Sequence, residues 1–134
     1  MTAAMLGRLE FFAGDHDEAD RYLRISEEAS SPDDVAAQTV WRGTRARLLA
    51  TAGAGSAREA EELANSSVAI VGATDYIRLH GDALVDRAAV LSALGRDELA
   101  MEDLHEAGVL FEGKGITSSL AVVRRRYDAL AATR

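Results

Sequence analysis

The sequence predicts an all-α protein built from antiparallel helical hairpins, and three observations support this fold class. A glycine recurs about every forty residues between two segments of helical periodicity, and an alanine in an acidic setting follows each glycine five residues later. The three pairs are Gly14 with Ala19, Gly55 with Ala60, and Gly95 with Ala100. No segment shows the apolar and polar alternation of a half-buried strand. A repeat of this length is typical of stacked helical hairpins.

Composition agrees with one helical domain spanning residues 1–134. Hydrophobic residues make up 48% of the chain, and Pro32 is the single proline. Alanine is abundant, and it both favours helices and lets them pack closely. Cysteine is absent, which excludes disulfides and thiolate metal sites in this sequence.

The net charge and the hydropathy of the chain limit where the protein can be located and which partners it can bind. The net charge of −7 repels phosphate backbones, so we expect no direct binding of nucleic acid. No apolar run reaches the roughly 18 residues of a membrane span, and the first residues lack the features of a signal peptide. We therefore expect a cytoplasmic protein without membrane contact.

The first predicted hairpin covers about residues 3–30. Its first helix carries apolar residues at helical spacing, namely Met5, Leu6, Leu9, Phe12 and Ala13. Gly14 should end this helix, because glycine tolerates the left-handed conformation of a helix stop. Asp15 or Asp17 should then cap the second helix. Ser30 to Asp34 form the clearest break in the chain.

The second predicted hairpin covers about residues 33–72. Pro32 fits the opening of its first helix, along which apolar positions recur from Val40 to Leu49. The turn that contains Gly55 is longer than the other turns. Ser56 should cap the following helix and form a capping box with Glu59.

The third predicted hairpin covers about residues 75–113, and a closing helix follows at 116–132. Gly95 marks the turn of the hairpin, and Thr117 or Ser118 should cap the closing helix. The sequence therefore predicts about seven helices. An unpaired last helix with a polar face would close the end of a helical array.

The third hairpin resembles a tetratricopeptide repeat. The matching residues are Ala88, Leu91, Gly95, Ala100, Leu104 and Ala107. The first hairpin matches through Gly7, Ala19 and Leu23, but Glu10 stands where the family has a large aromatic residue. The resemblance implies a right-handed solenoid that binds protein or peptide partners.

A finer resemblance covers most of the chain. The segments 40–46, 81–84, 89–96 and 110–115 are similar in order to the C-terminal repeat region of actinobacterial cyclase/AAA-ATPase or LuxR-type regulators. This resemblance implies a regulatory part of a larger signalling or transcriptional regulator, with Met1 lying within the array. Cyclase and ATPase activity do not carry over, because the chain has no phosphate-binding loop with a Gly-Lys-Ser/Thr ending.

No motif in the chain predicts catalysis. The histidines His16, His80 and His105 lie in separate segments without metal-ligand spacing, so solvated or capping roles are expected. One alternative stays open, a small-ligand-binding or enzymatic helical bundle with a pocket near His80. The run from Arg124 to Arg126 is either a solvated helix face or a docking patch for an acidic partner.

The sequence thus favours a non-catalytic scaffold that binds a protein or peptide, or other domains of a longer parent chain, and needs no cofactor or metal. The candidate groove residues are Leu6, Glu10, Gln38, Trp41, Arg45 and Arg78. Trp41 is either a core anchor between hairpins or an aromatic contact in the groove. Weak self-association through Met5, Leu9 and Phe12 is also expected, because these residues lack a preceding hairpin to cover them.

Overall fold

A computed structural model describes residues 2–133, so Met1 and the expectation attached to it lie outside the described residues. Within that range the chain forms seven α-helices, one short 3-10 turn and no strand. The helices are α1 (Ala3–Phe12), α2 (His16–Ala29), α3 (Val35–Thr51), α4 (Ala57–Gly72), α5 (Ile77–Ala93), α6 (Asp97–Lys114) and α7 (Thr117–Ala132). The all-α fold class and the expected number of helices are confirmed.

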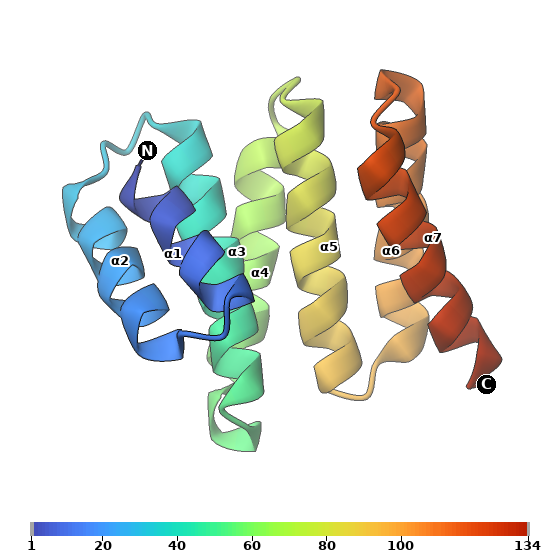
Figure 1. Ribbon diagram of the computed structural model, residues 1–134, viewed down its shortest axis with the longest axis horizontal. Coiled ribbons are helices and arrows are strands. Elements are labelled where there is room, and N and C mark those ends of the chain that lie inside the picture. The colour runs from blue at the N-terminus through green and yellow to red at the C-terminus, as the bar shows by residue number, and fades with distance from the viewer. Residues whose placement is uncertain (1, 134) are drawn as a thin grey trace.

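Neighbouring helices pack in antiparallel pairs, α1 with α2, α3 with α4 and α5 with α6 (Figure 1). The first helices of the pairs also pack on one another, since α3 contacts both α1 and α5. The second helices α2 and α4 contact the first helix of the next pair, and α7 packs on α6. Each pair therefore buries surface mainly against its neighbours along the chain.

The cap expected at Asp15 or Asp17 is present. The helix α3 begins at Val35, close to the expected start near residue 33, but Pro32 lies before its cap rather than in its first turn. The Oδ1 atom of Asp15 accepts a hydrogen bond from the backbone N–H of Glu18 at 3.1 Å, and Asp34 caps α3 in the same way. Gly14 follows α1 with a φ of 90°, in the left-handed region that favours glycine. These contacts satisfy backbone groups that a helix end leaves unpaired.

Two predicted caps are wrong. Ser56 occupies the position before α4, but its side chain makes no capping hydrogen bond, so the expected capping box with Glu59 does not form. A 3-10 turn at Ala54–Ser56 leads directly into this helix and leaves Ser56 without the extended backbone of a capping residue. Thr117 is already the first residue of α7, and the apolar Ile116 stands at its cap.

The core follows the line of helix contacts. One cluster joins α5, α6 and α7 through residues that include Leu84, Ala100, Leu104 and Phe111. Gly81 allows the close approach of Phe111, because a methyl group on Gly81 would come within 2.4 Å of that ring. Small residues at such crossings leave no room for larger side chains.

We predict that Ala100→Leu lowers the free energy of unfolding by about 1–3 kcal/mol, since Ala100 is fully buried and added methylenes would overpack the crossing of α5 and α6. The matched control is Glu102→Leu on the exposed side of α6, which should change stability by less than about 0.5 kcal/mol. Chemical denaturation of both variants is the measurement. Equal effects would contradict the packing of Ala100 described here.

Candidate functional site

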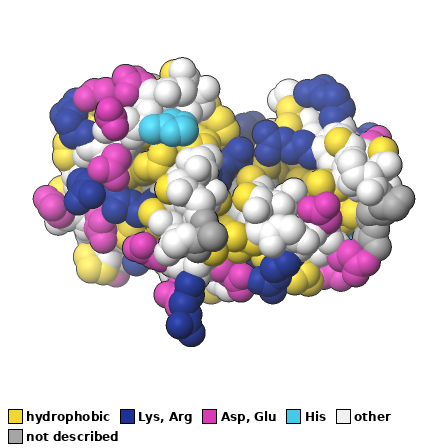
Figure 2. All heavy atoms as spheres, turned by 90° about the horizontal axis from the view of Figure 1, so that it is seen from below, with side chains coloured by type: hydrophobic (Ala, Val, Ile, Leu, Met, Phe, Trp, Pro, Cys, Tyr) yellow, Lys and Arg dark blue, Asp and Glu magenta, His cyan; other side chains and the backbone are white. Residues whose placement is uncertain are grey.

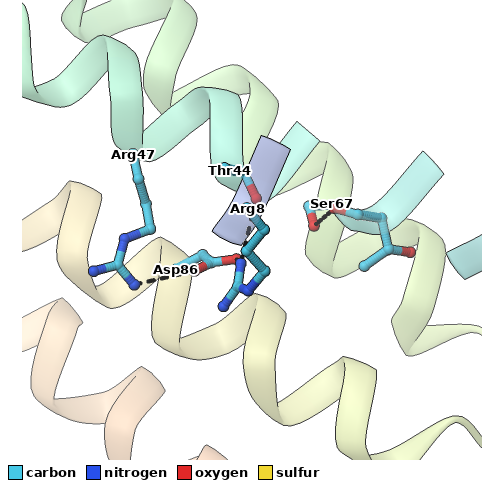
Figure 3. Close-up of polar contacts among 6 residues, drawn as sticks. Arg8, Thr44, Arg47, Ser67 and Asp86 are labelled. Carbon is cyan, nitrogen blue, oxygen red and sulfur yellow. Dashed lines mark hydrogen bonds and ion pairs between the residues drawn. The ribbon is translucent and has the colours of Figure 1, made fainter. Parts of the chain in front are cut away.

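A buried carboxylate on α5 joins three helices. Asp86 is only 3% exposed, and its two oxygens are held by arginines from different helices (Figure 3). Arg8 of α1 donates to Oδ2 at 2.7 Å, and Arg47 of α3 donates to Oδ1 at 3.1 Å. Arg8 also reaches the hydroxyl of Thr44 at 3.4 Å. Because a buried charge is costly unless it is paired, this arrangement constrains how α1, α3 and α5 lie together.

Small residues of α3 make room for the carboxylate. A methyl group on Gly43 would come within 2.6 Å of Asp86 Oδ2 and 3.3 Å of Ser67 Oγ. Ser67 itself donates a hydrogen bond of 2.8 Å to the backbone carbonyl of Thr39, which ties α4 to α3 (Figure 3). Gly43 is therefore explained by its contact with Asp86 rather than by backbone conformation.

The pKa values of Arg8 and Arg47 are shifted in opposite directions. Burial lowers the pKa of Arg8, but the charge and hydrogen bond of Asp86 outweigh burial and raise it overall. Burial is the main reason that the pKa of Arg47 is lowered, and the nearby positive charges of Arg126 and Arg8 add to that effect. Both guanidinium groups stay charged at neutral pH, since even a lowered arginine pKa lies far above it.

A second carboxylate lies one helical turn before Asp86. Burial raises the pKa of Asp82, and the negative charge of Asp86 adds to the shift, while Arg8 and Arg78 oppose it. The ionised form of Asp82 is thus less favourable in the folded protein than in water. Direct contacts with Arg8 and Arg47 offset the cost of burying the charge of Asp86, whereas the corresponding cost for Asp82 is offset only in part.

Aromatic rings of α1 surround the same arginines. The guanidinium of Arg8 lies 5.0 Å from the ring centre of Phe12, and that of Arg47 lies 4.9 Å from the same ring. Arg47 also lies 5.5 Å from the ring centre of Phe11. Phe12 remains 52% exposed, so this cation–π cluster is accessible from solvent.

Arg8, Asp82 and Asp86 line part of a hollow between α1 and α7, which we call the groove, and Phe12 lies against Arg8. Two cavities lie along it, on either side of α5. One of 190 Å³ is lined by Met5, Arg8, Arg78 and Asp82, among others. The other, of 260 Å³, is lined by residues that include Ala89, Ser92, Arg126 and Leu130. Figure 2 shows the molecule hollowed between its two ends, with Lys and Arg side chains inside and beside the hollow.

Of the candidate residues on α1 and α5, one lies at the groove and two point away from it. Arg78 lines the cavity beside Arg8, as expected for a groove residue. Leu6 and Glu10 are each two positions from Arg8, which turns them about 200° around the helix and away from the groove. The register of α1 therefore places Arg8 and Phe12, rather than Leu6 and Glu10, beside the hollow.

The candidate residues on α3 do not gather at the groove. Trp41 is 6% exposed and packs with Ala4 and Leu23 in the core, so the structure supports its role as an anchor. Gln38 accepts a hydrogen bond of 3.1 Å from the indole of Trp41. Arg45 turns toward α2, where it forms ion pairs with Asp20 and Glu27 at 3.6 and 3.5 Å.

Sequence reasoning missed Arg8, Arg47, Phe12 and Asp86 as groove residues. One signal was available, because Asp86 interrupts the mainly apolar helix 77–93 at a position that periodicity assigns to a packed face. A charged residue at such a position is seldom buried without a partner. The partners of Asp86 could not be predicted from the sequence, since Arg8 and Asp86 are separated by 78 positions in the chain.

The histidines do not converge. His16 stacks on Phe11 with ring centres 5.3 Å apart, and His80 lies against Gly72 at the end of α4. No cluster of three or more His, Cys, Asp or Glu residues suited to a metal ion occurs within residues 2–133. In the same range, no helix has the length and apolar character needed to cross a membrane.

Comparisons with protein-family models, with curated proteins and with solved structures give no match to this chain.

We predict that Asp86→Ala lowers the free energy of unfolding by about 3 kcal/mol, because it leaves the largely buried guanidinium groups of Arg8 and Arg47 without their shared counter-charge. Thermal and chemical denaturation at neutral pH are the measurements. A loss below about 1 kcal/mol would contradict a structural role for this network.

The matched control, Asp82→Asn, should act in the opposite direction. Because the pKa of Asp82 is raised in the folded state, its ionisation disfavours folding above that pKa and has no effect below the unfolded value. The variant should therefore be more stable than the wild type at neutral pH. The difference should shrink as the pH falls and Asp82 becomes protonated. A variant that is less stable at neutral pH would contradict this account.

Proposed function

We propose that this chain is a non-catalytic scaffold whose groove binds a protein or peptide partner. The observation that carries the proposal is the exposed ring of Phe12, which lies against the guanidinium groups of Arg8 and Arg47, next to a cavity that Arg8 lines. Aromatic residues and arginines contribute disproportionately to binding energy at protein interfaces. An apolar ring beside fixed hydrogen-bond donors offers both affinity and orientation to a partner.

The arrangement of helices supports a tetratricopeptide-like, right-handed solenoid as part of this proposal. Paired helices contact their neighbours in chain order, and the two cavities of the groove are lined by α1, α3 and α5 on one side and by α5, α6 and α7 on the other. Such arrays bind partners along extended surfaces made by successive repeats. With the sequence resemblance, this supports a cytoplasmic regulatory region of a larger signalling or transcriptional regulator.

The chemistry of the groove favours binding over catalysis. Its charged groups are arginines and the two carboxylates near them, and arginine does not exchange protons near neutral pH. Asp86 has both oxygens occupied and is nearly inaccessible to solvent. A general base needs a free acceptor within reach of its substrate, which Asp86 does not offer. The proposal involves no cofactor.

Selection of binders from a random peptide library displayed on phage tests this proposal. Selected peptides should bind Phe12→Ala about tenfold more weakly than the wild type, because the exposed ring is the expected central contact. Ile25→Ala is the matched control, since Ile25 is an exposed apolar residue of α2, a helix that contributes no residue to either cavity of the groove. Failure to enrich any peptide, or equal effects of the two variants, would contradict groove binding.

Self-association through α1 is a separate part of the proposal. Leu9 is 50% exposed and lies in an apolar row with Met5 and Phe12. We predict weak association that increases with concentration in static light scattering, and that Leu9→Glu abolishes it by placing a charge in the contact. Val109→Glu is the control, because Val109 is an equally exposed apolar residue on α6. A wild-type protein that stays monomeric at high concentration would contradict this prediction.

A further inference from the structure

The groove is basic although the chain is acidic. Six charged residues line its two cavities or contact Asp86, namely Arg8, Arg47, Arg78 and Arg126 against Asp82 and Asp86. The four arginines come from four different helices, α1, α3, α5 and α7. The chain as a whole carries −7. The groove therefore carries net positive charge in an acidic molecule, and Figure 2 shows Lys and Arg side chains inside and beside the hollow.

The two carboxylates do not neutralise this charge. Asp86 lies between Arg8 and Arg47, so one negative charge faces two positive charges. Asp82 is partly buried, and burial works against its ionisation. On the α7 side, Arg126 is exposed and makes no ion pair within 4 Å in the described chain. Its charge acts on Arg47, so two like charges influence one another beside the groove.

The three consecutive arginines on α7 point in different directions around the helix. Arg124 forms an ion pair of 3.7 Å with Glu112 of α6 and lines a cavity on the other side of α7. Arg125 is exposed and lines neither cavity of the groove. Successive residues point about 100° apart around a helix, so only Arg126 faces the groove. The run is thus not a single patch, and one of its members is available to a ligand in the groove.

We propose that the groove binds an acidic, extended segment of a partner protein, with a carboxylate of that segment contacting Arg126 and an apolar side chain resting on Phe12. This inference rests on the proposed function and specifies its partner. A carboxylate beside Arg126 would relieve its repulsion with Arg47 and accept the hydrogen bonds of a planar guanidinium. The exposed parts of Met5 and Phe12 supply the apolar contact.

A protein segment fits this site better than nucleic acid. A polyanionic strand would extend beyond the groove and meet the negative charge of the rest of the molecule. A short acidic segment brings only a few charges and places them at the arginines. The cavity beside Arg126 also presents apolar side chains, including Ala89 and Leu130, that suit side chains of a peptide better than phosphates.

The peptide selection described above also tests this inference. Enriched peptides should carry net negative charge, and Arg126→Glu should weaken their binding about tenfold by turning attraction into repulsion. Arg125→Glu is the matched control, since it makes the same charge change one residue away and should leave binding within about twofold. Both side chains are exposed, so thermal melting of the two variants should match the wild type.

The outcomes separate the two proposals. Enriched peptides that are neutral or basic, and that depend on Phe12 but not on Arg126, would overturn the acidic partner and leave groove binding intact. Failure to enrich any peptide would overturn both. Binding of a labelled single-stranded oligonucleotide that is lost in Arg126→Glu, together with no binding of acidic peptides, would assign the arginines to nucleic acid and overturn the inference.

Discussion

The buried carboxylate of Asp86 is the constraint on which the arrangement of the first three hairpins depends. It receives Arg8 from α1 and Arg47 from α3, and Gly43 provides the space in which it lies. Removing three charged groups from water costs nearly as much as their attraction returns, so such a network adds little net stability. Its effect is on specificity, because any other register of α1, α3 and α5 would bury a charge without its partner.

Apolar and ionic contacts have different roles in this fold. Close packing of small residues against larger ones joins the two helices of a hairpin, as Gly7 does with Leu23 and Gly81 with Phe111. Asp86 joins successive hairpins through charge. Arg87 and Asp103 are an exception, since they form a two-bond ion pair of 2.8 Å within the third hairpin. Ion pairs and hydrogen bonds are directional, so they fix how one helix is rotated about its axis relative to its neighbour. Packing of small residues alone defines that rotation less well.

The same arginines connect the fold to the proposed site. Arg8 and Arg47 compensate Asp86 inside the molecule and flank the exposed ring of Phe12 at its surface. The part of the groove around Phe12 is preorganised, because the guanidinium groups of Arg8 and Arg47 are already held by Asp86. Binding beside Phe12 would therefore cost these two side chains less conformational entropy than it would cost free arginine side chains.

The sequence by itself determined the helices, their order and the glycine turns of the first and third hairpins, because helical periodicity and glycine stops are local properties of the chain. It also limited the cap of α2 to Asp15 or Asp17, of which Asp15 is the cap, and it singled out Ala19 and Ala100, which are both fully buried. Only the tertiary structure decided which helix faces meet. Of the six expected groove residues, Arg78 alone lines a groove cavity, and Trp41 lies in the core. The reason is physical: a groove depends on how each helix is rotated relative to its neighbours, and here that rotation is constrained by Arg8 and Asp86, which are 78 positions apart in the sequence.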